Sequence, residues 1–291
     1  MRAAHFWVVG GDERQSCLAR LLAEDGHVVH TYALEEEDRP RGTVLRADSP
    51  DGLWRADCVI LPLPAQREEG VLNAPLCAHS VSTEEILEAM CPGQLLTGGK
   101  LGTALTEAAQ RRGLRCRDYF QREELAVANA VPTAEGAIQL AMENLPITLS
   151  GCRVLVLGYG RIGKLLARRL VALGAYVTVA ARRYEQLAWA QADGCAAQHL
   201  QGLTGWLCGY DLVVNTVPSL LLDRERLADL KPECLVIDLA SPPGGVDRMA
   251  AEELGVKVLW ALSLPGKVAP VTAARAIRES VYHLLEEETY A

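Results

Sequence analysis

The chain has 291 residues, of which 49% are hydrophobic and 23% are charged, and its formal net charge is −8. This length and balance predict a globular protein of two domains, each with its own core. Phosphate backbones call for a basic surface, so the negative charge argues against a nucleic-acid partner. No stretch has the length of a membrane span and the N-terminus does not read as a signal peptide, so we expect a cytoplasmic protein without a membrane partner.

The nine cysteines are scattered along the chain, and the six histidines show no metal-ligand spacing. Scattered cysteines of this kind are typical of reduced thiols in a cytosolic protein, not of a disulfide framework or a zinc site. We therefore expect no metal centre.

In the first half of the chain, short apolar runs alternate with helical patterns. Strands are predicted at residues 5–9, 27–32, 58–61, 94–97 and 114–117, and helices at 12–24, 83–90 and 102–112. The charged stretch 35–50 is predicted to be mostly surface loop, and another loop is predicted from Pro62 to Gly70. This alternation favours a parallel sheet with helices on both faces.

The second half repeats the theme from residue 153 onward. Strands are predicted at 153–157, 176–180, 212–216, 235–239 and 256–260, and helices at 161–173, 184–193, 224–230 and 247–254. The predicted fold class is therefore α/β, with two doubly wound α/β domains of which the second is a Rossmann dinucleotide-binding domain.

The domain boundary is predicted near a helix that begins after Pro132. We assign residues 1–130 to a substrate-side domain and 131–272 to the Rossmann domain. The last helix, about 273–288, makes the C-terminal segment 273–291 a candidate to pack back on the first domain.

A glycine motif marks the start of the second domain. Gly158, Gly160 and Gly163 form G-x-G-x-x-G between the apolar run VLVL and a helix that begins with Arg161 and Ile162. In this strand–turn–helix context the glycines allow a tight turn, approach of a pyrophosphate and close helix packing. The free N–H groups of the helix start then face the phosphates.

The next strand predicts which dinucleotide is bound. It ends at Ala181, followed by Arg182 and Arg183, where an NAD site would carry an acid for the ribose hydroxyls. Two guanidinium groups suit a 2′-phosphate, so the prediction is NADP(H). The alternative is that both arginines are merely solvated residues at a helix start.

Two further strand ends carry candidate ligand groups. Residues Asn215, Thr216, Val217 and Pro218 are predicted to border the cofactor, although they could instead form a simple turn. Near the N-terminus, GGDERQ places Asp12 and Arg14 at a helix start, where N–H groups and a guanidinium would suit a carboxylate ligand. Asp12 could equally well only cap that helix.

Taken together, the motifs resemble those of the dipicolinate synthase A-subunit family. The resemblance covers nearly the whole chain and is carried by these segments: GGDERQ, FQREELAVANAVPTAEG, VLVLGYGRIGKLLARRLVALGA, VVNTVPSLLL, VIDLASPPGGVD and LPGKVAPVTA. It implies oxidation of dihydrodipicolinate to dipicolinate with hydride transfer to NADP⁺. It also implies a partner, the dipicolinate synthase B-subunit, and a role in the mother cell of a sporulating bacterium.

With a dicarboxylate substrate in view, several residues become candidates. Asp12, Arg14, Asn129 and Ser241 are predicted to bind or orient it in a cleft between the domains. Glu135 and Lys267 are the predicted catalytic residues, Glu135 as proton acceptor. Glu135 could alternatively be a helix-capping acid beside Thr133.

Two rival functions remain open. One is another two-domain NADP-dependent dehydrogenase, acting on a 2-hydroxy acid or a shikimate-like substrate. The other is a non-catalytic protein that binds nucleotide within a complex, because binding motifs can outlast catalysis. The oligomeric state, including a homo-oligomer, is not decided by the sequence.

Overall fold

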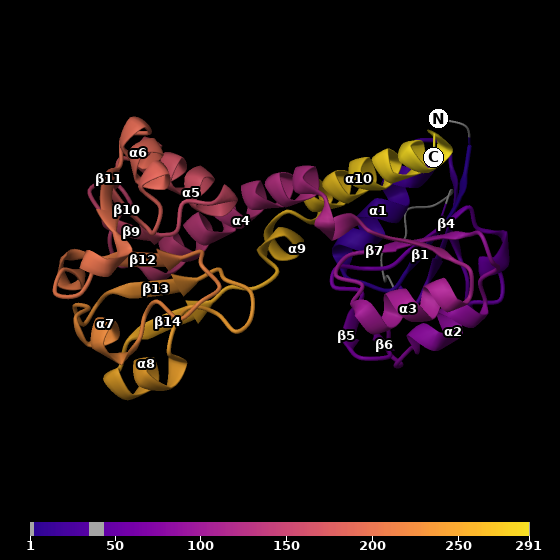
Figure 1. Ribbon diagram of the computed structural model, residues 1–291, viewed down its shortest axis with the longest axis horizontal. Coiled ribbons are helices and arrows are strands. Elements are labelled where there is room, and N and C mark those ends of the chain that lie inside the picture. Colours follow the sequence, from indigo (N-terminus) through magenta and orange to yellow (C-terminus); the bar gives the residue numbers. More distant parts are fainter. Residues whose placement is uncertain (1–2, 35–43, 291) are drawn as a thin grey trace. The chain divides into compact units, whose positions relative to one another are not determined.

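The computed structural model describes residues 3–34 and 44–290. The described residues up to Asn129 and from Ala269 onward form one compact unit, here called unit 1, and Ala130–Val268 form unit 2. Each unit contains one six-stranded parallel sheet with helices on both faces (Figure 1). The predicted α/β class with two doubly wound sheets is confirmed.

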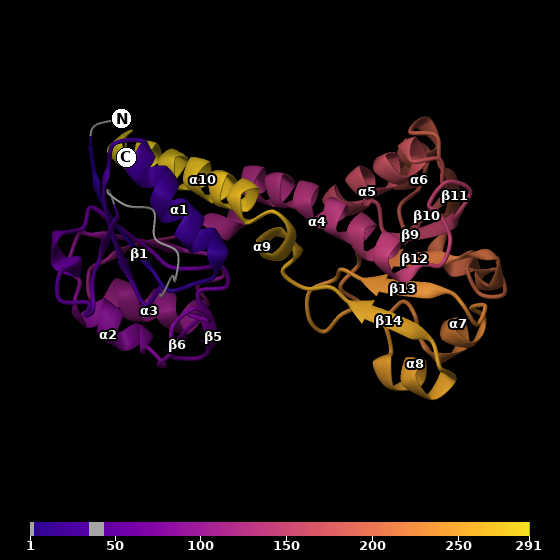
Figure 2. The same cartoon turned by 180° about the vertical axis from the view of Figure 1, so that it is seen from behind.

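The sheet of unit 1 has the order β3-β2-β1-β4-β7-β8. Its strands are β1 (His5–Val9), β2 (Val28–Tyr32), β3 (Val44–Arg46), β4 (Cys58–Ile60), β7 (Leu95–Gly98) and β8 (Arg115–Asp118). One face is covered by α1 (Glu13–Glu24) and α10 (Pro270–Tyr290), and the other by α2 (Thr83–Glu88) and α3 (Thr103–Arg111), as Figure 2 shows from behind.

The sheet of unit 2 has the order β11-β10-β9-β12-β13-β14. Its strands are β9 (Arg153–Leu157), β10 (Tyr176–Ala181), β11 (Ala196–His199), β12 (Leu212–Asn215), β13 (Leu235–Asp238) and β14 (Lys257–Trp260). One face carries α4 (Glu123–Asn144), α5 (Arg161–Ala172) and α6 (Tyr184–Ala192), and the other α7 (Arg224–Ala228) and α8 (Arg248–Leu254).

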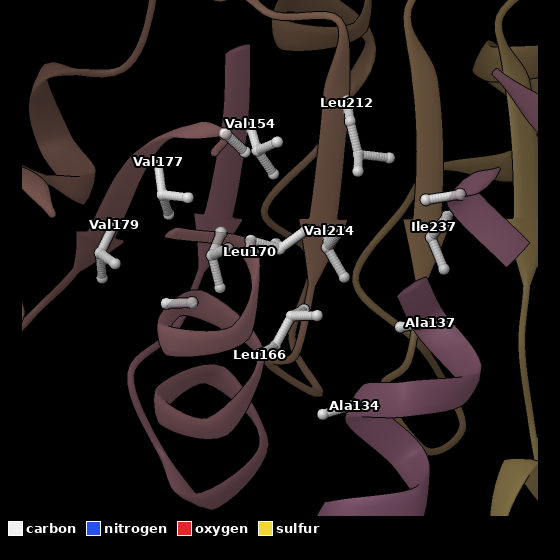
Figure 3. Close-up of a cluster of buried hydrophobic side chains, with 14 of the residues drawn as sticks. Ala134, Ala137, Val154, Leu166, Leu170, Val177, Val179, Leu212, Val214 and Ile237 are labelled. Carbon is white, nitrogen blue, oxygen red and sulfur yellow. The ribbon is translucent and has the colours of Figure 1, made fainter. Parts of the chain in front are cut away.

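The core of unit 2 explains why its strands read as continuous apolar runs. Val154 and Val214 belong to one buried cluster with Leu166 of α5 and Ala134 of α4 (Figure 3). Leu155 and Val213 belong to the buried cluster of the opposite face. A parallel strand buried on both faces has no polar alternation. Each buried leucine or valine contributes roughly 1.5–3 kcal/mol of transfer free energy.

The two sheets follow the same winding rule. In chain order, each places its strands as third, second, first, fourth, fifth and sixth, which is the Rossmann order. The direction of winding reverses between β1 and β4 in unit 1, and between β9 and β12 in unit 2. Ligands of such sheets bind outside the carboxyl ends of the strands at this reversal, called the switch point.

Several short elements were not predicted from the sequence. The predicted loop 35–50 contains β3, while residues 35–43 lie outside the described residues. The predicted loop that begins at Pro62 contains a small hairpin of β5 (Gln66–Glu68) and β6 (Val71–Leu72). β11 and α9 (Leu264–Val268) were also not predicted. These segments are too short for their periodicity to show, and β3 and β11 exist through pairing with a longer neighbour.

The helix predicted to begin after Pro132 was placed wrongly. α4 begins at Glu123 and continues through Pro132, although proline removes one helical hydrogen bond and costs about 3 kcal/mol in a helix interior. Leu125 before the proline and Ala134 and Ala137 after it are fully or almost fully buried. Packing on both sides of the proline offsets the lost bond.

Candidate dinucleotide site

The turn after β9 needs two of its three motif glycines for reasons of packing alone. Gly158 has φ +93°, and a Cβ there would lie 2.5 Å from Thr216 Oγ1 and 2.7 Å from Val217 Cγ2. A Cβ at Gly163 would collide with the carbonyl oxygen of Gly158. These glycines therefore let α5 and the loop after β12 close tightly around the turn.

Gly160 is different, because the protein itself gives no reason for a glycine there. It is the N-cap of α5, its φ is −84°, and a Cβ would meet nothing within 4 Å. Gly160 has no side chain to cap the helix, and the N–H groups at a helix start are groups that bind anions. Arg161 and Ile162, the first residues of that helix, are exposed and half-buried. A glycine without a packing role at this motif position is what a turn that lets a pyrophosphate approach the backbone requires.

Backbone bonds fix the turn from both neighbouring strands. The N–H of Gly158 donates to the carbonyl of Ala180 at 2.8 Å, and the N–H and Oγ1 of Thr216 both donate to the carbonyl of Leu157. The side chain of Gln186 in α6 donates to the carbonyl of Tyr159 at 3.4 Å. The glycine turn, the loop after β12 and the first part of α6 are therefore held together.

The tip of β10 presents uncompensated positive charge. Ala181 is buried, whereas Arg182 and Arg183 are exposed, and Arg183 is the N-cap of α6. Among the residues that the structure describes, no carboxylate pairs with either guanidinium. His199 contacts the carbonyl of Arg182 through Nε2 at 2.9 Å and stacks on Tyr184, with ring centroids 5.3 Å apart.

At the ends of β12 and β13, two buried polar side chains join neighbouring loops. Nδ2 of Asn215 donates to Asp238 Oδ1 at 2.8 Å and to the carbonyl of Val217 at 3.0 Å. Asn215 was predicted to border the cofactor, but its amide is occupied by protein groups. Its loop neighbours Thr216 and Val217 are half-buried and Pro218 is exposed.

Unit 1 has the corresponding turn, but there the helix start is filled. Asp12 is the N-cap of α1, and its carboxylate accepts from the backbone N–H and the guanidinium of Arg14. Burial raises the pKa of Asp12, but the bonds and charge of Arg14 outweigh it and hold this pKa below its usual value. Arg14 is 6% exposed and also donates to the carbonyl of Leu63 at 2.6 Å. The capping alternative for Asp12 is what the structure shows.

The remaining predicted site residues lie on separate elements. Glu135 is exposed on α4 and pairs with Arg169 of α5 at 3.5 Å. Lys267 is exposed on α9, Ser241 is exposed in the turn after β13, and Asn129 is half-buried in α4. Within the described chain, no hydrogen bond or ion pair joins Glu135, Lys267 and Ser241 to one another. Their roles stay predictions.

Asp238 was not among the predicted site residues. It ends a buried apolar strand, and no basic residue lies near it in the sequence. An acid at such a position, one strand away from an asparagine that ends β12, was a usable signal. Over residues 3–34 and 44–290, no three His, Cys, Asp or Glu side chains are grouped as a metal site would need.

The fold and this site define an α/β protein whose second unit binds a dinucleotide in Rossmann fashion. Residues 139–258 match the family described as Shikimate / quinate 5-dehydrogenase, and residues 5–120 match the family of the N-terminal domain of the dipicolinate synthase A-subunit. The dipicolinate synthase A-subunit of Bacillus subtilis (strain 168) is 33% identical over 283 residues, which is 96% of this chain and 95% of that protein. The chain belongs to the dipicolinate synthase A-subunit family.

Solved structures agree with this assignment. The A-subunit of dipicolinate synthase from Bacillus subtilis superposes with a TM-score of 0.87 at 32% identity, covering 99% of this chain and 97% of that one. The A-subunit from Bacillus halodurans also gives 0.87 at 32% identity, with 97% of each chain covered. A transhydrogenase from Sinorhizobium meliloti, at 16% identity and a TM-score of 0.74, shares the fold. No helix among the described residues is long and apolar enough to cross a bilayer.

Proposed function

We propose that the chain oxidises dihydrodipicolinate to dipicolinate, with NADP⁺ as the hydride acceptor. The family relationship supports the substrate, because relatives over almost the whole length are named as the A-subunit of dipicolinate synthase. The observation that carries the choice of cofactor is the tip of β10, where Arg182 and Arg183 are exposed and have no acidic partner in the described chain.

The two arginines favour NADP over NAD for a physical reason. An NAD site places a carboxylate at this strand tip to bond the ribose hydroxyls, and that carboxylate would repel a 2′-phosphate. Here Ala181 ends the strand and leaves room, while a guanidinium can bond phosphate oxygens in pairs. Gly160 leaves the start of α5 open for the pyrophosphate.

The proposed reaction makes modest demands on the chain. The substrate ring loses a hydride and a proton and becomes an aromatic pyridine; bound NADP⁺ supplies the acceptor for the hydride. The protein must hold the ring and take up one proton, so positioning supplies much of the barrier reduction. Ser241 and Lys267 are proposed to contact substrate carboxylates, and Glu135 to accept the proton.

A partner is part of this proposal. The relatives carry the letter A in their names, which implies a companion B-subunit, and we propose that the chain works with this companion in the cytoplasm of the mother cell during sporulation. Self-association into a homo-oligomer is compatible with this arrangement.

The direct test is an assay of the purified chain with dihydrodipicolinate and NADP⁺ or NAD⁺, with and without the B-subunit. Dipicolinate formed with NADP⁺ supports the proposal. Because unit 2 also matches a shikimate dehydrogenase family, shikimate is the matched rival substrate. Oxidation of shikimate in preference to dihydrodipicolinate, or nucleotide binding without any turnover in the presence of the B-subunit, contradicts the proposed reaction.

The cofactor choice has its own test. Replacing both Arg182 and Arg183 by alanine should weaken NADPH binding at least roughly ten- to a hundredfold, because the loss of even one charge-assisted bond to the 2′-phosphate costs about 1.5–3 kcal/mol. NADH affinity should stay within about twofold, because NADH has no 2′-phosphate. Fluorescence titrations measure both constants. Equal losses for the two nucleotides would show that the arginines do not read the phosphate.

A further inference from the structure

Asp238 is a buried carboxylate held only by N–H groups. It is 3% exposed at the end of β13. Oδ1 accepts from Asn215 Nδ2 at 2.8 Å and from the N–H of Ala240 at 3.1 Å, and Oδ2 accepts from the N–H of Gly245 at 2.9 Å. In the residues described, no lysine, arginine or histidine pairs with it.

Burying a carboxylate without a cationic partner costs free energy of folding. Transferring a carboxylate out of water is strongly unfavourable unless partners compensate, and buried acids are normally paired with a cation. Here three neutral donors take that place, and two of them belong to one loop, residues 240–245, here called the β13 loop. The carboxylate therefore folds the β13 loop back onto the end of its own strand.

Asn215 does the same for the neighbouring strand. It is 0% exposed, and Oδ1 accepts from the N–H of Val217 while Nδ2 donates to the carbonyl of the same residue. The segment 216–219, here called the β12 loop, is thereby fixed to the end of β12. The Asn215–Asp238 bond then ties the β12 loop to the β13 loop.

The Asn215–Asp238 pair leaves no room for a side chain at two positions of the β13 loop, and both are glycines. Gly244 has φ +86°, and a Cβ there would lie 2.8 Å from Asp238 Oδ2. A Cβ at Gly245 would collide with Asn215 Nδ2 and come within 2.8 Å of the carbonyl oxygen of Val217. The segments VVNTVP and DLASPPGG, which are separate in the sequence, are thus the two halves of one hydrogen-bonded unit.

The strand order shows which part of a ligand this unit would face. The switch point lies between β9 and β12, with the open start of α5 above it and the arginines of β10 on one side. If the pyrophosphate lies at the switch point and the adenosine half over β10, the other half of the dinucleotide must extend over β12 and β13.

We propose that the Asn215–Asp238 pair is a positioning device that holds the β12 and β13 loops against the nicotinamide half of the cofactor. The proposal rests on the dinucleotide site proposed above, but not on the identity of the oxidised substrate. Neither side chain touches the cofactor; both act through the loops that they fix.

The test compares two aspartates of the same sheet. Asp238→Asn removes the acceptor for one of its donors and leaves that donor facing an amide N–H₂ group. The control is Asp211→Asn. Asp211 lies just before β12, at the amino ends of the strands, where its carboxylate pairs with Lys231 and accepts from the N–H of Arg153 at 2.7 Å. Each variant is titrated with NADPH and with adenosine 2′,5′-bisphosphate, which lacks the nicotinamide half.

Asp238→Asn should weaken NADPH binding roughly tenfold, because the two loops, once less well fixed, must be ordered when the nicotinamide half binds. It should leave binding of the bisphosphate within about twofold, and Asp211→Asn should change neither ligand by more than that. Amide exchange at Ala240 and Gly245 should speed up only in the Asp238 variant. Because the bisphosphate reports the adenosine half alone, a general loss of structure would weaken both ligands.

A second variant keeps the carboxylate. Gly245→Ala disturbs the same pair through the collision with Asn215 and should give the same selective loss, so the test does not depend on the folding of one variant. Wild-type affinity for NADPH in both variants, or equal losses for both ligands, overturns the positioning role and leaves the proposed function intact. A wild-type chain that binds neither ligand overturns both proposals.

Discussion

The two units wind their sheets in the same order but treat the first turn differently. β1 is followed by Gly10, Gly11 and the N-cap Asp12, and β9 is followed at the same spacing by Gly158, Tyr159 and the N-cap Gly160. In unit 1 the helix start holds a carboxylate of the chain itself. In unit 2 it is left open.

The next residues continue the contrast. Where α5 has Gly163, α1 has Gln15, whose side chain donates to the carbonyl of Leu61 across the switch point at 3.1 Å. A Cβ at Gly10 would lie 2.6 Å from Leu72 Cδ2, so the β6 residue covers that turn. Both units have the switch point at which such sheets bind ligands, but in unit 1 side chains of the chain itself lie beside it. The N-cap residue and the side chain at the third motif position are therefore the two differences by which we propose that only unit 2 takes a nucleotide.

The sharpest way to test this comparison is to give unit 2 the N-cap of unit 1. Gly160→Asp should weaken NADPH binding more than a hundredfold, since a carboxylate would occupy the helix start and repel the pyrophosphate. The same change should leave the fold intact and add a few tenths of a kcal/mol of stability, because the φ of −84° suits any residue, the site is open and aspartate is a good N-cap.

Binding is measured by NADPH fluorescence and stability by urea unfolding. Gly160→Ala is the control, since it adds a Cβ without the charge and should affect binding less. A Gly160→Asp variant that binds NADPH as the wild type does would show that the pyrophosphate lies elsewhere.

The third glycine should behave in the opposite way. Gly163→Ala places a Cβ against the backbone carbonyl of Gly158, so we expect a loss of about 2–3 kcal/mol in the free energy of unfolding from overpacking. Gly160→Ala should change it by less than about 0.5 kcal/mol. Chemical denaturation compares the pair directly, and equal stabilities would mean that Gly163 is not required for packing.

Unit 1 provides the converse experiment. Asp12→Ala removes the N-cap of α1 and leaves the buried Arg14 guanidinium without its carboxylate, so stability should fall by about 2 kcal/mol. Part of the Asp12 side chain is exposed, which keeps this below the loss for a fully buried pair. Combining Asp12→Ser with Arg14→Met should restore most of it, because the cap returns and no charge is left unpaired. If the double variant is less stable than Asp12→Ala, the pair contributes more than a cap and a charge.

How much of this could be read from the sequence depends on how local each feature is. The turn of unit 2 was predictable, because β9, the three glycines and the amphipathic α5 follow one another within residues 153–172. The closed turn of unit 1 was not, since Arg14 and Gln15 act on carbonyls of Leu63 and Leu61, 49 and 46 residues away. The Asn215–Asp238 bond likewise spans 23 residues and exists only once β12 and β13 pair.

The ends of helices and strands were likewise predictable where local sequence sets them and not where distant contacts do. Buried strands such as β1 and β9 were predicted with their observed ends, because each is an apolar run that begins after a polar first residue and stops at a glycine. The start of α4 was missed, since the local preference against an internal proline was overridden by packing on both sides. Sequence patterns report local energies, and the exceptions are places where tertiary contacts outweigh them.

The smallest expected effect is a difference between the units in how much acid lowers their free energy of unfolding. In unit 1, His27 is 8% exposed, accepts from the N–H of Ala4 through Nδ1 at 3.2 Å, and lies against Phe6 and Tyr282. Burial lowers the pKa of His27, and nearby Asp25 opposes this only in part. The folded state therefore takes up a proton at lower pH than the unfolded state does.

Just below pH 6.5 the unfolded state therefore binds more protons than the folded state. The stability that neutral His27 contributes is present above pH 6.5. It is lost as the pH falls toward the pKa that His27 has in the folded state. Going from about pH 7.5 to about pH 5.5 should lower the free energy of unfolding of unit 1 by roughly 0.5–1 kcal/mol. His27→Gln, which can still accept from Ala4 but does not titrate, should reduce this fall. Unit 2 has one histidine, the exposed His199, and should respond less. Urea unfolding of the wild type and the variant at both pH values measures the difference, and the same pH dependence in the two proteins would show that His27 is not the group responsible.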